Sequence, residues 1–290
     1  MAVFIVAVQI LSLLLVSPLT QYELQAFENP ESVWNPLLYI VLILLFTGAL
    51  LLIIKYRVKW LIQIFIVFAV LSTLVYVLFG LQALALPEMS PEILAVTAIA
   101  GSILLTALMV VFPEWYVIDT VGILIAAGAS AMFGVSLAII PTIVLLVVLA
   151  IYDFISVYKT KHMITLAEGV MDDKLPILFV LPRKLSYSYA RSRMKKLQPG
   201  QEREAYFMGL GDAVMPTILA VSANAFLKAP AVGFITIPAL GVMIGTLASY
   251  VALMYLVLKG KPQAGLPFLC TGAILGFLAG CAAAGVNPFF

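Results

Sequence analysis

Long apolar runs, separated by short charged or proline-rich breaks, make up most of this chain. A transmembrane helix needs about 20 mostly apolar residues, and inside a bilayer only helices or a closed barrel satisfy the backbone. Because the runs are continuous, the pattern predicts an all-α, polytopic membrane protein with nine transmembrane helices. The predicted spans lie near residues 2–22, 36–54, 60–86, 92–112, 117–137, 139–158, 206–226, 231–258 and 264–286.

Composition agrees with a location in lipid. Hydrophobic residues make up 64% of the 290 residues and charged residues 10%, and the mean hydropathy is +1.16, whereas a soluble domain is roughly half apolar. The formal net charge of +2 gives no indication of a nucleic-acid partner. Cys270 and Cys281 lie eleven residues apart in one predicted helix, which is about 16 Å and too far for a disulfide.

The basic residues are gathered on one side of the predicted bundle. Of the sixteen Lys and Arg residues, fifteen follow the second, sixth or eighth span, and only Lys228 falls on the opposite side. The positive-inside rule therefore predicts a cytoplasmic N-terminus and a C-terminus outside. The same pattern divides the chain into a six-span part (1–158), a basic cytoplasmic loop (159–205) and a three-span part (206–290).

Two acidic residues, Asp153 and Asp212, fall inside predicted spans rather than in loops. Asp153 precedes Lys159 by six residues and Asp212 follows Arg203 by nine, which places them about 9 Å and at most about 13 Å along their helices from the same surface. A carboxylate within a membrane is costly and usually faces the bundle interior with a function. Both are expected in the cytoplasmic half, where they can meet if the sixth and seventh helices touch.

Two carboxyls in contact would share a proton, so one could deprotonate water while the other donates to a peptide carbonyl. Glycines around Asp212 and Pro216 four residues after it predict an unwound, water-accessible stretch. A proton-coupled transporter or channel, with the two acids as a relay, is the alternative. No internal repeat with a second acid in the corresponding place supports it.

The motifs around both acids resemble those of the GxGD intramembrane aspartyl proteases, the presenilins and signal peptide peptidases. Tyr152-Asp153 is similar to the family's YD motif, and Gly209-Leu210-Gly211-Asp212 to its GLGD motif. The resemblance implies a presenilin-like bundle that hydrolyses peptide bonds within transmembrane segments, with both aspartates catalytic and no cofactor. It also implies substrate positioning by Tyr152, Gly209, Leu210 and Gly211. We interpret the chain as a prokaryotic presenilin-like homologue of the cell membrane.

The third family motif, PAL, has two candidates in this sequence. Pro238-Ala239-Leu240 matches literally, but it follows Asp212 by only 26 residues and falls within the eighth span. The family has this motif at the start of the ninth span. We therefore assign substrate positioning to the segment at that place, which comprises Ala264, Gly265, Leu266 and Pro267.

Other features receive lesser assignments. The resemblance implies strand pairing with an unwound substrate, and the apolar stretch 175–182 in the basic loop is a candidate for an added strand. His162 is the only histidine, so neither an HExxH metal site nor a serine–histidine dyad within the membrane is expected. We assign no role to Asp119. The expected partners are the lipid bilayer and transmembrane peptides or membrane proteins as substrates; a homo-oligomer stays open.

Overall fold

The computed structural model describes residues 1–27, 29–55, 59–160, 178–184, 187–189, 205–258 and 263–288. Within them the chain forms nine α-helices, so the predicted helix count is confirmed. Seven of these helices are long and apolar enough to cross a membrane, and in the other two the described apolar stretch is shorter. The helices are α1 (Ala2–Gln21), α2 (Trp34–Lys55), α3 (Lys59–Ala85), α4 (Pro91–Val111), α5 (Trp115–Ser136), α6 (Ile139–Ile155), α8 (Leu210–Phe226), α9 (Ile237–Leu258) and α10 (Gly265–Ala284).

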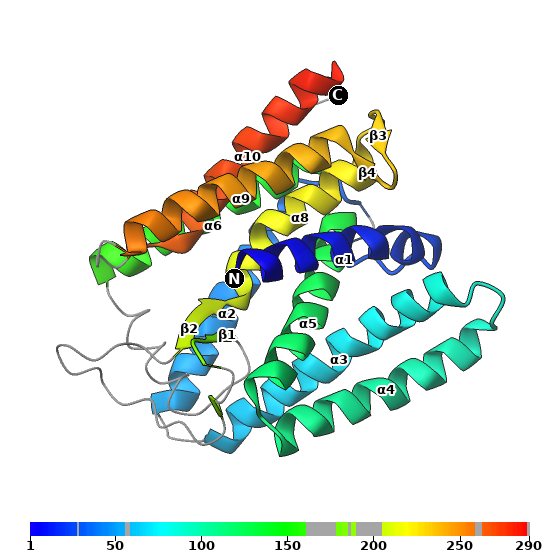
Figure 1. The fold of residues 1–290 in the computed structure, drawn as a ribbon, viewed down its shortest axis with the longest axis vertical. Coiled ribbons are helices and arrows are strands. Elements are labelled where there is room, and N and C mark those ends of the chain that lie inside the picture. Colours follow the sequence, from blue (N-terminus) through cyan, green and yellow to red (C-terminus); the bar gives the residue numbers. More distant parts are fainter. Residues whose placement is uncertain are drawn as a thin grey trace.

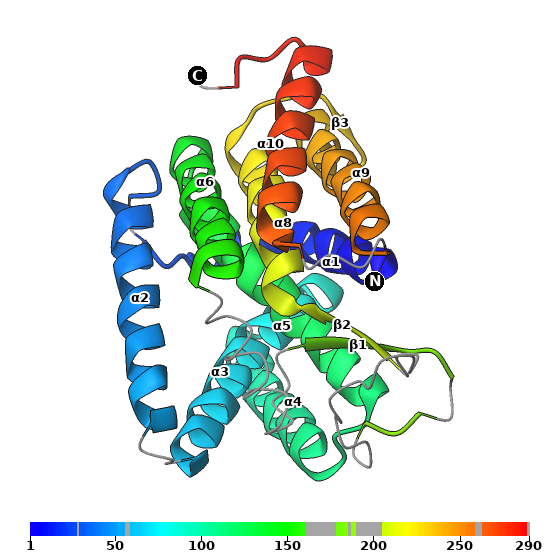
Figure 2. The same cartoon turned by 90° about the vertical axis from the view of Figure 1, so that its left-hand side faces the viewer.

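Helix α8 occupies the centre of the bundle. It packs against α1, α5, α6, α9 and α10, and its middle is almost entirely buried. Helices α9 and α10 lie side by side at one end, whereas α3 and α4 form a hairpin at the other (Figure 1). Helix α2 lies at the periphery, where it packs against α6 and α3 (Figure 2). The helix that carries Asp212 is therefore in contact with five of the other eight described helices.

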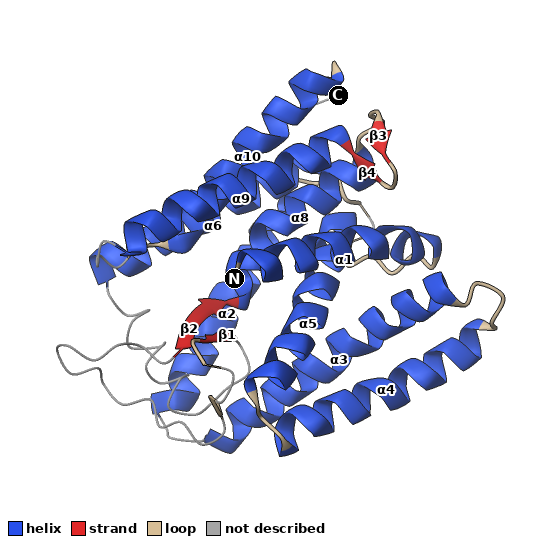
Figure 3. Ribbon diagram, viewed as in Figure 1, coloured by secondary structure: helices blue, strands red, loops and turns tan. Residues whose placement is uncertain are grey.

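Two short antiparallel sheets flank α8 and were not part of the predicted helical pattern (Figure 3). Strand β1 (Leu178–Pro182) pairs with β2 (Ala205–Gly209), which runs directly into α8. Strand β3 (Ala231–Val232) pairs with β4 (Ile235–Thr236) in the connection to α9. Strands β2, β3 and β4 contain residues that the sequence pattern places in the seventh and eighth spans. Helix α8 therefore begins only at Leu210 and α9 only at Ile237.

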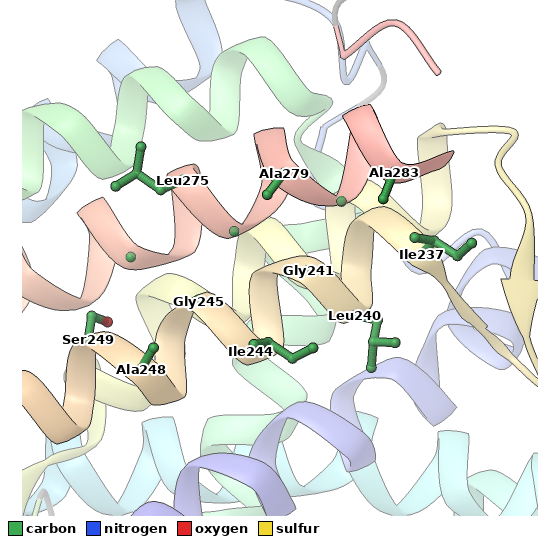
Figure 4. Close-up of a pocket in the computed structure, with 13 residues that line it drawn as sticks. Ile237, Leu240, Gly241, Ile244, Gly245, Ala248, Ser249, Leu275, Ala279 and Ala283 are labelled. Atoms are coloured by element: carbon green, nitrogen blue, oxygen red, sulfur yellow. The ribbon is translucent and has the colours of Figure 1, made fainter. Parts of the chain in front are cut away.

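Glycines bring α9 and α10 into close contact. Gly241 and Gly245 of α9 face Gly272 and Gly276 of the antiparallel α10 (Figure 4). A Cβ atom on Gly276 would overlap the carbonyl oxygen of Gly241, so the two backbones touch as small-residue helix faces in membranes do. Nearby, Cys270 and Cys281 are buried and free of disulfides, as their spacing predicts.

Candidate active site

Asp153 lies in the last turn of α6, where the regular helix widens into a single π-turn (η1, Ser156–Thr160). Its side chain is only 4% exposed. One carboxylate oxygen, Oδ2, accepts a hydrogen bond from the backbone N–H of Leu266 at 3.2 Å. Asp153 is thereby tied to the start of α10, more than 100 residues away in the sequence.

Asp212 lies in the first turn of α8. Strand β2 ends at Gly209, which has extended backbone angles (φ −63°, ψ 139°) and is the N-cap of the helix. The Gly209 backbone also forms a hydrogen bond with the Asp212 carboxylate. The N-terminal turn of a helix favours a negative side chain, because the free amides and the helix dipole are positive there.

The predicted unwinding at Asp212 is wrong in its extent. Helix α8 runs without interruption from Leu210 to Phe226 and includes both Asp212 and Pro216. The irregular backbone ends at Gly209, because the antiparallel pairing of β2 with β1 holds that residue in an extended conformation. Pro216 removes one amide from the helix without breaking it.

The two carboxylates meet at the N-terminus of α10. They are close enough to interact electrostatically with each other, and the Leu266 N–H beside Gly265 binds Asp153. A Cβ atom built on Gly265 would lie 3.2 Å from Oδ1 of Asp212. Ala264, the buried N-cap residue, precedes Gly265. Three helices, α6, α8 and α10, thus build one site with two carboxylates beside the positive end of a helix.

The remaining predicted site residues lie at different distances from this pair. A Cβ on Gly209 would be 3.6 Å from Oδ2 of Asp212, whereas Gly211 faces open space. Leu210 points toward α5, where its side chain would contact a Cβ on Gly122 at 3.2 Å. Tyr152 is 36% exposed, in contrast to the buried Asp153 beside it.

Pro267 lines a cavity of about 480 Å³ between the end of α6, α9 and α10. Ala264, Phe154 and Tyr158 line the same cavity, and the Tyr158 hydroxyl donates a hydrogen bond to Oε1 of Gln263 at 2.7 Å. The cavity therefore begins at the segment that also contacts both aspartates.

The literal Pro238-Ala239-Leu240 lies in the first turn of α9, far from the two carboxylates. Pro238 packs against Gly280 near the C-terminal end of α10. Fifteen residues of helix separate Gly280 from Gly265, which corresponds to about 22 Å. Leu240 lines an apolar groove of about 600 Å³ along α9 and α10 (Figure 4).

Sequence reasoning missed two features near the site. The added strand suggested for 175–182 is present as β1 in the described residues 178–182, whereas the apolar pattern places its partner β2 in the seventh span. The sequence pattern indicates no role for Asp119, yet its Oδ1 accepts the N–H of Val180 in β1 at 2.7 Å. The sequence Ala205-Tyr206-Phe207-Met208-Gly209, with two adjacent aromatics, is a signal for a strand.

His162 lies outside the described residues.

Comparison with known proteins gives a consistent result. The family model described as signal-peptide peptidase, presenilin aspartyl protease matches residues 1–286. Two solved structures, both described as a presenilin family intramembrane aspartate protease, are similar to the chain. The one in space group C222 has 39% sequence identity and a TM-score of 0.73 and covers 98% of each chain. The one in space group P2 has 41% identity and a TM-score of 0.70 and covers 98% of this chain and 96% of the other. No curated protein matches the chain.

Proposed function

Because the chain belongs to the family of signal-peptide peptidases and presenilin aspartyl proteases, we propose that Asp153 and Asp212 are its catalytic pair. The family match and the similar structures make the chain a multi-pass membrane protein and an intramembrane aspartic-type endopeptidase. They support hydrolysis rather than the alternative of a transporter or channel. The observation that carries the assignment of residues is the meeting of the two carboxylates at the N-terminus of α10.

The chemistry follows from the proximity of the two carboxyls. Two such groups in a low-dielectric site do not both ionise easily, so the pair holds one proton and titrates as a unit. The ionised carboxylate removes a proton from water, and the resulting oxygen attacks the carbonyl carbon of the peptide bond. The protonated carboxyl donates its proton to the carbonyl oxygen, as in soluble aspartic proteases. The carboxyl that took the proton from water then passes it to the amide nitrogen, while the other carboxylate regains a proton from a hydroxyl of the tetrahedral intermediate. The C–N bond breaks and releases the amine and the carboxylic acid.

We further propose that Ala264, Gly265, Leu266 and Pro267 position the substrate. The Leu266 N–H binds Asp153, and a Cβ built on Gly265 would lie 3.2 Å from Oδ1 of Asp212. A peptide bond held along this segment would therefore reach both carboxylates. Gly209 and Gly211 leave space on the other side of Asp212. We propose the same positioning role for Tyr152 and Leu210; the contact of Leu210 with α5 fixes the start of α8.

The proposed substrate is a transmembrane helix that has been locally unwound. Its exposed backbone then needs hydrogen-bond partners, because none are available in lipid. Val180 donates its N–H to Asp119, so the outer edge of β1 is already covered at that residue. Among the described residues the sheet contains only β1 and β2, which leaves the outer edge of β2 for a third strand.

The positions of the basic residues support a cytoplasmic N-terminus and an active site in the cytoplasmic half of a prokaryotic cell membrane. Both carboxylates come from one chain, so the proposed reaction does not require a second copy. A homo-oligomer would add neighbours without completing the site.

The test is cleavage of a transmembrane peptide by the purified protein in liposomes. Asp153→Asn and Asp212→Asn should each lower kcat by at least about 10³-fold, because each removes one half of a unit that works together. Neither variant should lower the melting temperature, since Asn has nearly the same shape. Glu92→Gln, at the exposed start of α4, is the matched control and should retain full activity. Cleavage that persists in either Asp variant would refute the proposed pair.

A further inference from the structure

Asp119, in the second turn of α5, is a third buried carboxylate that the proposed reaction does not use. It is 4% exposed. Its Oδ1 accepts the Val180 N–H at 2.7 Å, whereas its Oδ2 is buried without a hydrogen-bond partner among the described residues.

An aspartate in this environment lowers the stability of the fold. A buried carboxylate loses its hydration, and one unsatisfied oxygen makes that loss larger. An apolar side chain of similar size would fill the same space without this penalty. A residue that weakens the fold locally is expected where it contributes to function.

The hydrogen bond of Asp119 holds β1 against α5. In an antiparallel ladder, a residue whose N–H points away from its partner strand belongs to a non-hydrogen-bonded pair, so Val180 is free to bind Asp119 without loss to the sheet. The neighbouring Phe179 is fully buried and packs against Phe4, with ring centroids 5.2 Å apart, and against Gly122 of α5. Asp119 and Gly122 are three residues apart, on one face of the helix.

Through the pairing of β1 with β2, the attachment of β1 to α5 also restrains the position of Asp212. Leu178 of β1 lies opposite Gly209 of β2. Gly209 is both the last residue of β2 and the N-cap of α8, and its backbone contacts the Asp212 carboxylate. A displacement of β1 along α5 would therefore move Gly209, and with it the first turn of α8.

We propose that Asp119 is a positioning residue of the active site: its hydrogen bond to Val180 fixes the sheet and so sets where Asp212 stands relative to Asp153. This inference rests on the proposed catalytic role of Asp212. Asp119 acts through the backbone and does not touch the reacting atoms.

A second acidic residue at the start of α5 provides a control for Asp119. Glu114, the N-cap residue of α5, accepts hydrogen bonds from the Ser188 hydroxyl at 2.7 Å and from the Tyr189 N–H at 3.2 Å. These contacts hold residues beyond the C-terminal end of β1, which are further from Gly209 along the ladder. Glu114→Gln is therefore a matched change that should affect docking of this segment but not the position of Asp212.

The experiment compares Asp119→Ala, Asp119→Asn and Glu114→Gln in the same cleavage assay, beside the wild type and Asp212→Asn. Asp119→Ala should lower kcat about 10- to 100-fold and change KM less than about 2-fold, because a misplacement of about 1 Å can cost that much. Asp119→Asn should restore most of kcat, since the amide oxygen still accepts the Val180 N–H. The inhibition constant of a hydroxyl-bearing transition-state isostere should rise by the factor by which kcat/KM falls.

Val180→Pro tests the hydrogen bond from its other partner. Proline removes the N–H without removing a bond to β2, so this variant should resemble Asp119→Ala, and the double variant should be no slower than either single one. Wild-type kcat in Asp119→Ala, equal losses in the Ala and Asn variants, or additive losses in the double variant would each overturn the inference. If Asp119→Ala fails to fold, the kcat values of Asp119→Asn and Val180→Pro, compared with that of the wild type, test the inference instead. Cleavage by Asp212→Asn would instead refute the proposed function.

Discussion

The two ends of α10 use glycine for opposite purposes. At the N-terminal end, Gly265 lies beside a carboxylate, with a built Cβ 3.2 Å from Oδ1 of Asp212. Along the C-terminal half, Gly276 and Gly280 lie against the backbone of α9, and a Cβ on Gly276 would overlap a carbonyl oxygen of that helix. The first glycine leaves space beside a carboxylate of the proposed catalytic pair, whereas the others allow two helices to touch.

This difference bears on the two candidates for the PAL motif. Pro238 and Leu240 lie at the packing end of the α9–α10 pair, where Pro238 contacts Gly280. The segment around Leu266 lies at the other end, at the two carboxylates. Position along the antiparallel helices α9 and α10 therefore distinguishes the two candidate PAL segments better than their match to the motif sequence does.

The largest effect is expected at the packing end. Gly276→Val places a branched side chain where even a Cβ meets the backbone of α9, so the helices must separate and stability should fall by about 3 kcal/mol or more. Thermal unfolding of the purified protein in detergent should show a much lower melting temperature, and cleavage should be lost with the fold.

Gly48→Ala on α2 is the control for this change, because a Cβ at Gly48 meets nothing within 4 Å. That variant should keep its melting temperature or gain slightly, since alanine restricts the unfolded chain more than glycine does. A wild-type melting temperature for Gly276→Val would show that the close approach of α9 and α10 is not needed.

The helices, and the position of the two aspartates within them, could be predicted because their signals are local. An apolar run of about 20 residues predicts a span, and flanking charges predict similar depths for Asp153 and Asp212. The pattern of apolar residues did not predict strand β2, because its conformation depends on pairing with β1, which ends at Pro182, 23 residues before β2 begins at Ala205. The partner of Asp119 was hidden for the same reason: Val180 is 61 residues away in the sequence.

An intermediate effect is expected at Gly265. In Gly265→Ala the new methyl group would lie 3.2 to 3.4 Å from the Asp212 carboxyl atoms, so that side chain must move by a few tenths of an ångström. We expect kcat to fall about 10-fold, because displaced catalytic groups lose rate steeply, and the melting temperature to stay within about 2 °C. Steady-state cleavage and thermal unfolding measure the two quantities separately. A lower melting temperature with unchanged kcat would place Gly265 with the packing glycines instead.

The smallest effect is expected from a matched pair of leucine truncations. Leu266→Ala keeps the backbone N–H that binds Asp153 and removes only the side chain, so we expect kcat/KM to fall about 3- to 10-fold, as for loss of an apolar contact with substrate. Leu240→Ala removes the same atoms from the apolar groove along α9 and α10 and should change kcat/KM less than about 2-fold.

Because both substitutions delete an identical side chain from a partly buried site in the same pair of helices, a general loss of packing would affect them alike. A larger loss in Leu266→Ala would thus reflect its position at the carboxylates. The opposite order, with Leu240→Ala the slower enzyme at unchanged melting temperature, would assign substrate positioning to the literal Pro238-Ala239-Leu240. That result would require the substrate to extend along α10 for about 22 Å beyond the aspartates.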